Sequence, residues 1–158
     1  MSIHPNSTSI ADLAKPGNLL VPLEASDKRS AIDLLVDHVC EAEKVDDVEE
    51  MKHLVWARED QRSTGIGNGL AIPHAKSDAI SRLMLGIGIL PGSVDFESID
   101  ERPVRMVALL LSPSSEIAEH IQALGKISRM MNDEGFREAA FACTDARELR
   151  ELIVAACD

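Results

Sequence analysis

The segment of this chain best suited to chemistry runs from Gln61 to His74, where glycines alternate with other residues before a Pro-His pair. Its letters are QRSTGIGNGLAIPH. An imidazole is a competent nucleophile near neutral pH because a useful fraction of it is uncharged there. Pro73 stiffens the backbone just before His74 and should hold the direction of the ring steady. The segment therefore predicts a nucleophilic histidine at the end of a glycine-rich loop.

The residues before His74 suit an anion, and phosphate in particular. Alternating glycines let successive backbone N–H groups approach a ligand closely. Hydroxyl groups and a planar guanidinium add donors that match phosphate oxygens. The candidate phosphate-binding residues are Ser63, Thr64, Gly65, Gly67 and Gly69, with Arg58 as the candidate charge. Phosphoryl transfer needs mainly positioning and charge stabilisation, so transfer of a phosphoryl group to His74 is the predicted chemistry.

Each of these features also has a plainer interpretation. A Gly-x-Gly-x-Gly loop by itself is more typical of a tight turn than of a ligand site. It is not a nucleotide-binding loop, since no Gly-Lys-Ser/Thr follows and the Rossmann glycine spacing is absent. A single histidine after proline is likewise more typical of a surface position than of a nucleophile. The chemistry of the residues alone leaves the two interpretations evenly matched.

Composition narrows the class of protein. The chain has 158 residues, a net charge of −11 and 3% aromatic residues, which suits one domain with a substantial core. This acidity and the few aromatic rings argue against a nucleic-acid partner. The three cysteines lack metal-ligand spacing and indicate a reducing compartment. Neither a signal peptide nor an apolar run of the ~18 residues that span a bilayer is found, so we expect a cytoplasmic protein with no membrane insertion.

The flanking sequence predicts the elements that position this segment. Apolar runs predict strands over residues 18–24, 83–90 and 104–111, and residues 61–74 are expected to be a loop entering a short strand. Apolar periodicity predicts five helices, which open at Ser26, Asp47, Ser115, Asp133 and Thr144. In the helix after Ser115, we expect one buried stripe made of Ile117, Ile121, Leu124, Ile127 or Ser128, and Met131. The alternation indicates the α/β class: a single compact domain over residues 1–158, with a central mixed β-sheet flanked by helices and a mobile N-terminus at residues 1–9.

The Arg58–His74 segment resembles the active-site signature of the enzyme IIA domains of the fructose/mannitol type of phosphotransferase system. That group includes the nitrogen-regulatory IIA-like proteins. The resemblance rests on Arg58-Glu59 and on the letters STGIGNGLAIPH, and it continues through AKSDAI, VDF and EHIQAL further along the chain. It extends from about residue 10 to residue 153, which is nearly the whole sequence.

The resemblance implies roles for particular residues. His74 would accept a phosphoryl group on Nε2 from the phosphocarrier protein HPr, Arg58 would steady the phosphoryl oxygens, and His120 would be the second family histidine beside it. His120 also borders the expected buried side of its helix, although an ordinary histidine at the edge of the core fits that position too. His38 and His53 match no family position and are expected at the surface. No cofactor is implied, and two imidazoles without a third ligand make a poor metal site.

Two uses of the phosphate remain open for such a phosphohistidine transferase. The absence of a fused IIB or membrane segment favours a free-standing nitrogen or metabolic regulatory protein, whose phosphorylation changes its binding to a target protein. The alternative is a transport subunit that passes phosphate to a IIB domain for fructose- or mannitol-type sugar uptake. A domain that only binds partners and takes no phosphate is disfavoured by the intact signature. In each case we expect an apolar partner surface around His74, with Ile66, Leu70 and Ile72 as candidates.

Overall fold

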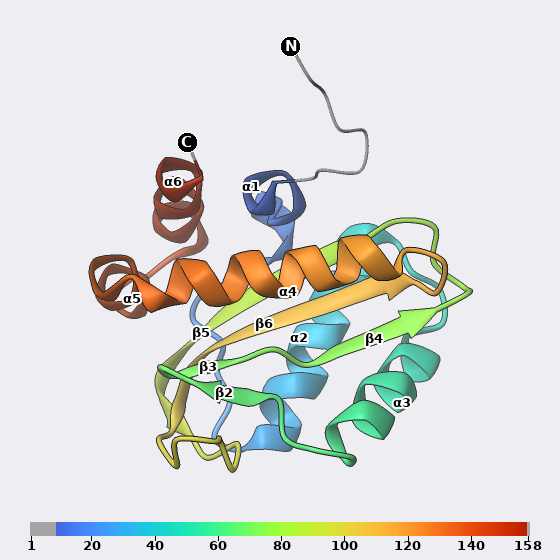
Figure 1. The fold of residues 1–158 in the computed structure, drawn as a ribbon, viewed down its shortest axis with the longest axis horizontal. Coiled ribbons are helices and arrows are strands. Elements are labelled where there is room, and N and C mark those ends of the chain that lie inside the picture. Colours follow the sequence, from blue (N-terminus) through green and yellow to red (C-terminus); the bar gives the residue numbers. More distant parts are fainter. Residues whose placement is uncertain (1–8, 158) are drawn as a thin grey trace.

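Two long strands form the centre of the molecule (Figure 1). The computed structural model describes residues 9–157. Strands β5 (Met84–Val94) and β6 (Val104–Pro113) pair antiparallel, with Met84 opposite Leu111. Strand β6 includes the whole run predicted over residues 104–111, β5 includes the run predicted over residues 83–90 except Leu83, and both continue beyond the predicted C-terminal ends.

Four short strands complete a six-stranded sheet. They are β1 (Leu19–Leu20), β2 (Gly65–Gly67), β3 (Leu70–Ala71) and β4 (His74–Ser77). The order is β1-β5-β6-β3-β2, and β4 also pairs with β6. Strand β1 is parallel to β5, strands β3 and β4 are parallel to β6, and β2 is antiparallel to β3. The sheet is therefore mixed, as predicted, and the segment expected to be a loop contains a small hairpin.

Helices cover both faces of this sheet (Figure 1). One face packs against α2 (Lys28–Glu43) and α3 (Val48–Glu59). The other face packs against α1 (Ile10–Leu13), α4 (Ile117–Asn132), α5 (Glu134–Phe141) and α6 (Ala146–Ala156). A short 3-10 turn, Pro16–Asn18, precedes β1. The predicted α/β class, a single compact domain with a central mixed sheet between helices, is confirmed.

Side chains of β6 alternate between the two cores because successive residues of a strand point to opposite faces. Leu109 and Leu111 pack with residues of α2 and α3, whereas Ala108 and Leu110 pack on the side of α4. By the same alternation Ser112 faces α4, and it is fully buried there. A hydroxyl at such a depth needs a hydrogen-bond partner, which α4 supplies.

Aspartates begin most of the long helices by accepting a backbone N–H of the first turn. These aspartates are Asp27, Asp47, Asp133 and Asp145. The predicted openings at Asp47 and Asp133 are confirmed. Those at Ser26 and Thr144 are wrong by one residue, because the aspartate that follows each of them accepts the N–H. The opening at Ser115 is also one residue early, since Glu116 precedes the first residue of α4.

The strand predicted over residues 18–24 is too long. Only Leu19 and Leu20 pair with β5 in regular register. Pro22 has no N–H to donate, so the ladder is interrupted there, and pairing resumes where the N–H of Leu23 donates to the carbonyl of Ile89 at 2.7 Å.

The buried side of α4 agrees with the prediction at Ile127 and Met131 but differs from it at Ile117 and Ile121. Ile117 and Ile121 are 54% and 61% exposed. The buried line of the helix is His120, Ala123, Ile127 and Met131. A hydrogen bond to Ser112 satisfies the imidazole of His120, so a polar side chain occupies the inward position and the two isoleucines face outward.

Of the N-terminal segment expected to be mobile, residues 1–9, the structure describes only Ser9. Residues 1–8 lie outside the described residues, but Ser9 is ordered as the cap of α1, where its Oγ accepts the N–H of Asp12 at 3.1 Å.

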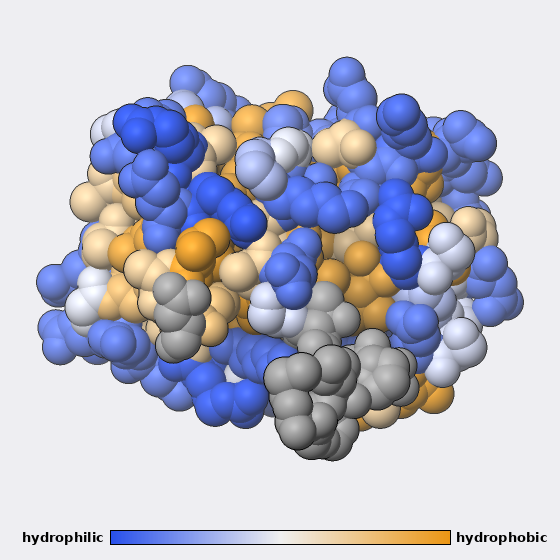
Figure 2. Space-filling model, turned by 90° about the horizontal axis from the view of Figure 1, so that it is seen from above, coloured by the Kyte–Doolittle hydropathy of each residue, from blue (hydrophilic) through white to orange (hydrophobic). Residues whose placement is uncertain are grey.

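Seen from the side of α1, α4 and α6, the surface is largely hydrophilic, with apolar side chains showing between the charged ones (Figure 2). Across residues 9–157 no helix is long and apolar enough to cross a bilayer.

Candidate phosphoryl-acceptor site

His74 is the first residue of β4, where it lies opposite Leu110 of β6 and is half-buried. Its Nδ1 is 2.7 Å from the carbonyl oxygen of Ile72. A carbonyl oxygen can only accept, so Nδ1 carries the hydrogen and Nε2 carries the lone pair in the neutral ring. Of the two ring nitrogens, Nε2 is therefore the one with a lone pair that could act as a nucleophile.

His120 comes from α4 and lies directly beside His74. The two ring centroids are 5.2 Å apart in an edge-to-face arrangement, with 64° between the planes. The Nδ1 of His120 is 2.6 Å from the Oγ of Ser112, and the residue is only 2% exposed. Nδ1 is thus engaged by β6, which leaves Nε2 of His120 as the nitrogen available to a group on His74.

Burial keeps both imidazoles uncharged. It lowers the pKa of His120 to about 4, and the positive charge that His74 would carry on protonation acts in the same direction. Burial also lowers the pKa of His74, against an opposing contribution from the hydrogen bond to Ile72, while the nearby guanidinium of Arg58 lowers it further. At neutral pH the pair is therefore neutral, which is the state that a nucleophilic nitrogen requires.

A hollow of about 320 Å³ opens beside His74. Among its lining residues are His74, Arg58, Ser63 and Thr64. One guanidinium nitrogen of Arg58, Nη1, donates to the carbonyl of Arg62 at 2.8 Å, which fixes the side chain at the rim. The structure thus brings the predicted nucleophile, the predicted charge and the two predicted hydroxyl residues together.

Both hydroxyl groups are engaged within the protein. Ser63 Oγ donates to the carbonyl of Phe96 and accepts the N–H of Gly65 at 3.1 Å. Thr64 Oγ1 donates to a carboxylate oxygen of Glu59 at 2.5 Å. Their hydrogens therefore shape the loop in this state, and contact between these two residues and phosphate stays a prediction.

The three glycines are not among the residues that line this hollow. Gly67 and Gly69 have φ values of 107° and 74°, a region that favours glycine. A Cβ on Gly69 would lie 2.8 Å from the ring of Phe141, so α5 packs directly against the turn of the hairpin. Gly65 is enclosed by Ser98 in the same way. Close packing accounts for these positions, and a phosphate contact by their N–H groups stays a prediction.

The apolar surface near His74 differs from the one expected. Ile66 is 41% exposed, as predicted, but Leu70 and Ile72 are 1% and 3% exposed because they pack into the core beneath α4. The exposed apolar residues on this side are instead contributed by two other elements. We call Ile66, Ile99, Ile117 and Ile121 the isoleucine rim.

Sequence reasoning missed three contributors to this region. Ser112 carried a signal, since it continues the alternation of β6 by one residue toward the helix that bears His120. Glu59 was part of the family resemblance, but its burial was not signalled, because an acidic residue at the end of a helix is usually exposed. Ile99 lies in a turn-rich segment, whose proximity to His74 depends on how the segment folds back on β2, where the N–H of Ile99 donates to Gly65 at 3.1 Å.

Histidines outside the site differ in exposure. His53 is exposed, as expected, whereas His38 is partly buried and its Nε2 is 3.2 Å from the carbonyl of Leu19. Within the described part of the chain, no group of three or more His, Cys, Asp or Glu side chains is arranged to hold a metal ion.

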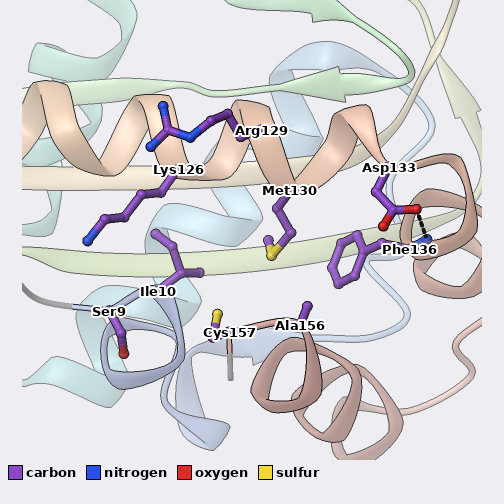
Figure 3. Close-up of a pocket in the computed structure, with 9 residues that line it drawn as sticks. All are labelled: Ser9, Ile10, Lys126, Arg129, Met130, Asp133, Phe136, Ala156 and Cys157. Atoms are coloured by element: carbon purple, nitrogen blue, oxygen red, sulfur yellow. Dashed lines mark hydrogen bonds between the residues drawn. The ribbon is translucent and has the colours of Figure 1, made fainter.

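A larger hollow, of about 470 Å³, lies on the opposite side of α4. Its walls include Ile10, Met130 and Phe136, and Lys126 and Arg129 extend from α4 near it (Figure 3). It contains none of the predicted site residues, so the candidate site is identified by its chemistry and not by its size.

Comparison with known proteins identifies the family of this chain. The chain is 29% identical to the fructose-specific EIIA component of Haloferax volcanii, over 80% of this chain and 82% of that protein. It is 31% identical to a nitrogen regulatory protein of Bradyrhizobium diazoefficiens, over 91% of this chain and 94% of that protein. The crystal structure of the nitrogen regulatory protein IIA-Ntr from Neisseria meningitidis has the same fold, with a TM-score of 0.84 at 24% identity over 91% of this chain and 98% of that one. Residues 13–156 match the family described as phosphoenolpyruvate-dependent sugar phosphotransferase system, EIIA 2. This chain therefore belongs to the EIIA type 2 family of the phosphotransferase system.

Proposed function

We propose that the protein is a phosphoryl carrier that accepts a phosphoryl group on Nε2 of His74 from an HPr-type phosphocarrier protein. The observation that carries the proposal is the 2.7 Å hydrogen bond from Nδ1 of His74 to the carbonyl of Ile72. It leaves the Nε2 lone pair of a neutral, half-buried ring beside a hollow of about 320 Å³, which has room for a phosphoryl group.

The transfer step balances without a cofactor. The Nε2 lone pair of His74 forms a bond to phosphorus while the P–N bond of the donor phosphohistidine breaks. The electron pair of that bond returns to the donor ring, which leaves as neutral imidazole if its other nitrogen is protonated. His74 keeps its proton on Nδ1, so its phosphorylated ring is cationic, and the carbonyl of Ile72 stabilises that charge.

Two neighbouring residues stabilise the phosphoryl group in this proposal. With the Ser112 hydroxyl donating to Nδ1 of His120, the Nε2–H of His120 donates to a phosphoryl oxygen. Arg58 offers its remaining guanidinium N–H groups from the rim of the hollow. Both are fixed before the phosphoryl group arrives, so little reorganisation accompanies transfer.

The isoleucine rim is the proposed docking surface for the phosphoryl donor and for the acceptor. Ile66 and Ile99 line the same hollow as His74, and Ile117 and Ile121 project from the helix that carries His120. An apolar rim of a few residues suits a transient complex, because the small buried area permits fast release.

We propose a nitrogen or metabolic regulatory role in preference to sugar transport. The full-length match to a nitrogen regulatory protein, which covers 94% of that relative, supports this choice. In this role the phosphorylation state of His74 changes the binding of a target protein to the rim. Transport, in which a IIB domain receives the phosphoryl group for fructose- or mannitol-type uptake, is the second candidate, supported by the match to a fructose-specific EIIA component.

Intact-mass spectrometry tests the carrier role. The protein and its His74→Ala variant are incubated with phosphoenolpyruvate, enzyme I and HPr, and a known IIA domain serves as positive control. One acid-labile phosphate on the native chain and none on the variant is the expected result. No phosphate on the native chain, with the control labelled, would refute the proposal. A labelled protein that then fails to transfer to fructose- or mannitol-type IIB domains would favour the regulatory role.

A further inference from the structure

A buried ion pair lies behind the hydroxyl residues of the hollow. Glu59 is the last residue of α3, and its side chain is only 1% exposed. Its Oε2 is 2.8 Å from Nζ of Lys28, the first residue of α2. A carboxylate at this depth is costly unless it is paired and hydrogen-bonded, and Lys28 and the partners described next satisfy this requirement for Glu59.

Glu59 holds Thr64 through two hydrogen bonds. Its Oε2 accepts the backbone N–H of Thr64 at 2.9 Å, and its Oε1 accepts the hydroxyl of Thr64 at 2.5 Å. Hydrogen bonds to an ionised carboxylate are shorter and stronger than neutral ones. Thr64, which is 3% exposed, is thereby fixed at the entrance to the glycine hairpin.

Thr64 in turn fixes the carbonyl group on which the His74 ring depends. The N–H of Ile72 donates to the carbonyl of Thr64 at 3.0 Å. The carbonyl of the same residue, Ile72, accepts the Nδ1–H of His74 at 2.7 Å. A continuous series of hydrogen bonds therefore joins the carboxylate of Glu59 to the imidazole through Thr64 and Ile72.

From this series we infer that Glu59, held by Lys28, is a positioning residue that keeps His74 in the Nδ1–H tautomer. Without the carboxylate, Thr64 and the Ile72 carbonyl lose their fixed positions. The ring then spends part of its time with the hydrogen on Nε2, and in that form Nε2 has no lone pair to attack phosphorus. The consequence for transfer rests on the proposed function, whereas the tautomer is a property of the unphosphorylated protein.

The chain offers a matched control in a second buried carboxylate. The side chain of Glu43 is 3% exposed, and its oxygens bind Lys15 at 3.1 Å, Arg82 at 2.9 Å and Asn18 at 2.9 Å. This network also reaches β5, where Asn18 donates to the carbonyl of Leu85 at 3.1 Å. Replacing Glu43 with glutamine thus removes a buried charge of the same kind from a network that leads to a different strand.

The experiment compares Glu59→Gln with Glu43→Gln in the full chain. The tautomer of His74 is measured from its ring ¹⁵N chemical shifts in the unphosphorylated protein at neutral pH. The rate of phosphoryl uptake is measured in single turnovers at saturating phosphorylated HPr. We expect Glu59→Gln to give a mixture of tautomers and a rate about tenfold or more lower, with the half-saturating HPr concentration unchanged. Glu43→Gln should lower thermal stability yet keep the Nδ1–H tautomer and the native rate.

Two threonine variants extend the test should Glu59→Gln not fold. Thr64→Ser keeps both hydrogen bonds and should keep the native tautomer, while Thr64→Val removes one bond and should give part of the Glu59→Gln effect. A folded Glu59→Gln variant, or Thr64→Val in its place, in which His74 remains entirely Nδ1–H would overturn the inference. Because the tautomer is measured without phosphate, this result is separate from any failure of His74 to be phosphorylated.

Discussion

The end of β4 and the inner side of α4 each contribute one imidazole to the same place, yet they hold it differently. His74 is half-buried and bonds to a backbone carbonyl, which leaves one nitrogen facing the hollow. His120 is buried, with 2% of its surface exposed, and forms a hydrogen bond with the side-chain hydroxyl of Ser112. A backbone carbonyl accepts only, so it fixes the tautomer of His74, whereas a hydroxyl can donate or accept and leaves His120 able to adjust to its neighbour. Under the proposed function, the half-buried ring of His74 forms the bond to phosphorus and the buried ring of His120 responds to the charge.

Removing the buried ring of His120 should have the largest effect on the rate of phosphoryl uptake by His74. In His120→Asn the phosphoryl group on His74 loses a preorganised donor, and uptake from phosphorylated HPr should slow by about 100-fold. Stopped-flow or quench-flow single turnovers measure this rate. His53→Asn, at an exposed histidine, is the control and should behave like the native chain. An unchanged rate in His120→Asn would mean that His120 is a core residue only.

The pH dependence of the free energy of unfolding should distinguish the two imidazole rings. The pKa of His120 is about 4 in the folded chain, below its ordinary value, so between these two pH values the unfolded chain binds a proton that the folded chain does not. The free energy of unfolding should therefore fall as the pH is lowered below the ordinary value, by about 2 kcal/mol between about pH 7.5 and about pH 5. Urea unfolding at several pH values measures it.

The same titration in variants assigns the effect. His120→Asn should remove most of the dependence, while the lowered pKa of His74 leaves a smaller contribution of the same sign. A native chain whose stability is flat over this range would contradict the burial of a neutral His120.

Loss of the hydroxyl partner should have a smaller effect than loss of the ring. Ser112→Ala leaves Nδ1 of His120 unpaired, so the proton of His120 is no longer held on Nε2 and phosphoryl uptake should slow by about tenfold. Ser112→Thr retains a hydroxyl and should recover part of the rate if the extra methyl is accommodated. Ring ¹⁵N shifts of His120 in both variants check the cause, since an unchanged tautomer in Ser112→Ala would separate any rate change from this hydrogen bond.

The smallest predicted effect concerns the outer side of α4. Ile121→Ser should raise the half-saturating concentration of HPr by about fivefold and leave the saturated rate unchanged, because it removes apolar docking area and touches neither ring. Leu34→Ser is the control, since Leu34 is also an exposed apolar residue on a helix but belongs to α2, on the other face of the sheet. Equal effects of both substitutions would argue against the isoleucine rim as the docking surface.

The sequence predicted much of the fold because its signals were local. The apolar runs of β5 and β6 and the caps Asp47 and Asp133 act within a few residues, and the structure agrees with them. The errors at Ser26 and Thr144 are single-residue choices between adjacent capping side chains. By contrast, the exposure of Ile117 and Ile121 could not be predicted from periodicity, since a buried histidine satisfied from another strand occupies the inward line.

The candidate site was predictable in part. His74, Arg58, Ser63 and Thr64 were expected together because they are close in the chain, and His120 was expected from the family resemblance. The contacts of Glu59 with Thr64 and of Ser112 with His120 depend on packing between elements. A carboxylate or hydroxyl acquires such a role only after burial removes its water, and a single sequence contains no direct sign of that burial.

The two sides of helix α4 are expected to experience different evolutionary constraints. Its inward line carries His120, and under the proposed function replacing this residue alters chemistry that every partner depends on, whereas Ile117 and Ile121 on the outward line would contact only the docked partner. Substitutions on the outer line can therefore accumulate and redirect the protein to new targets without first disabling it. A helix of this construction gives a phosphate relay room to diverge into a signalling protein through viable intermediates.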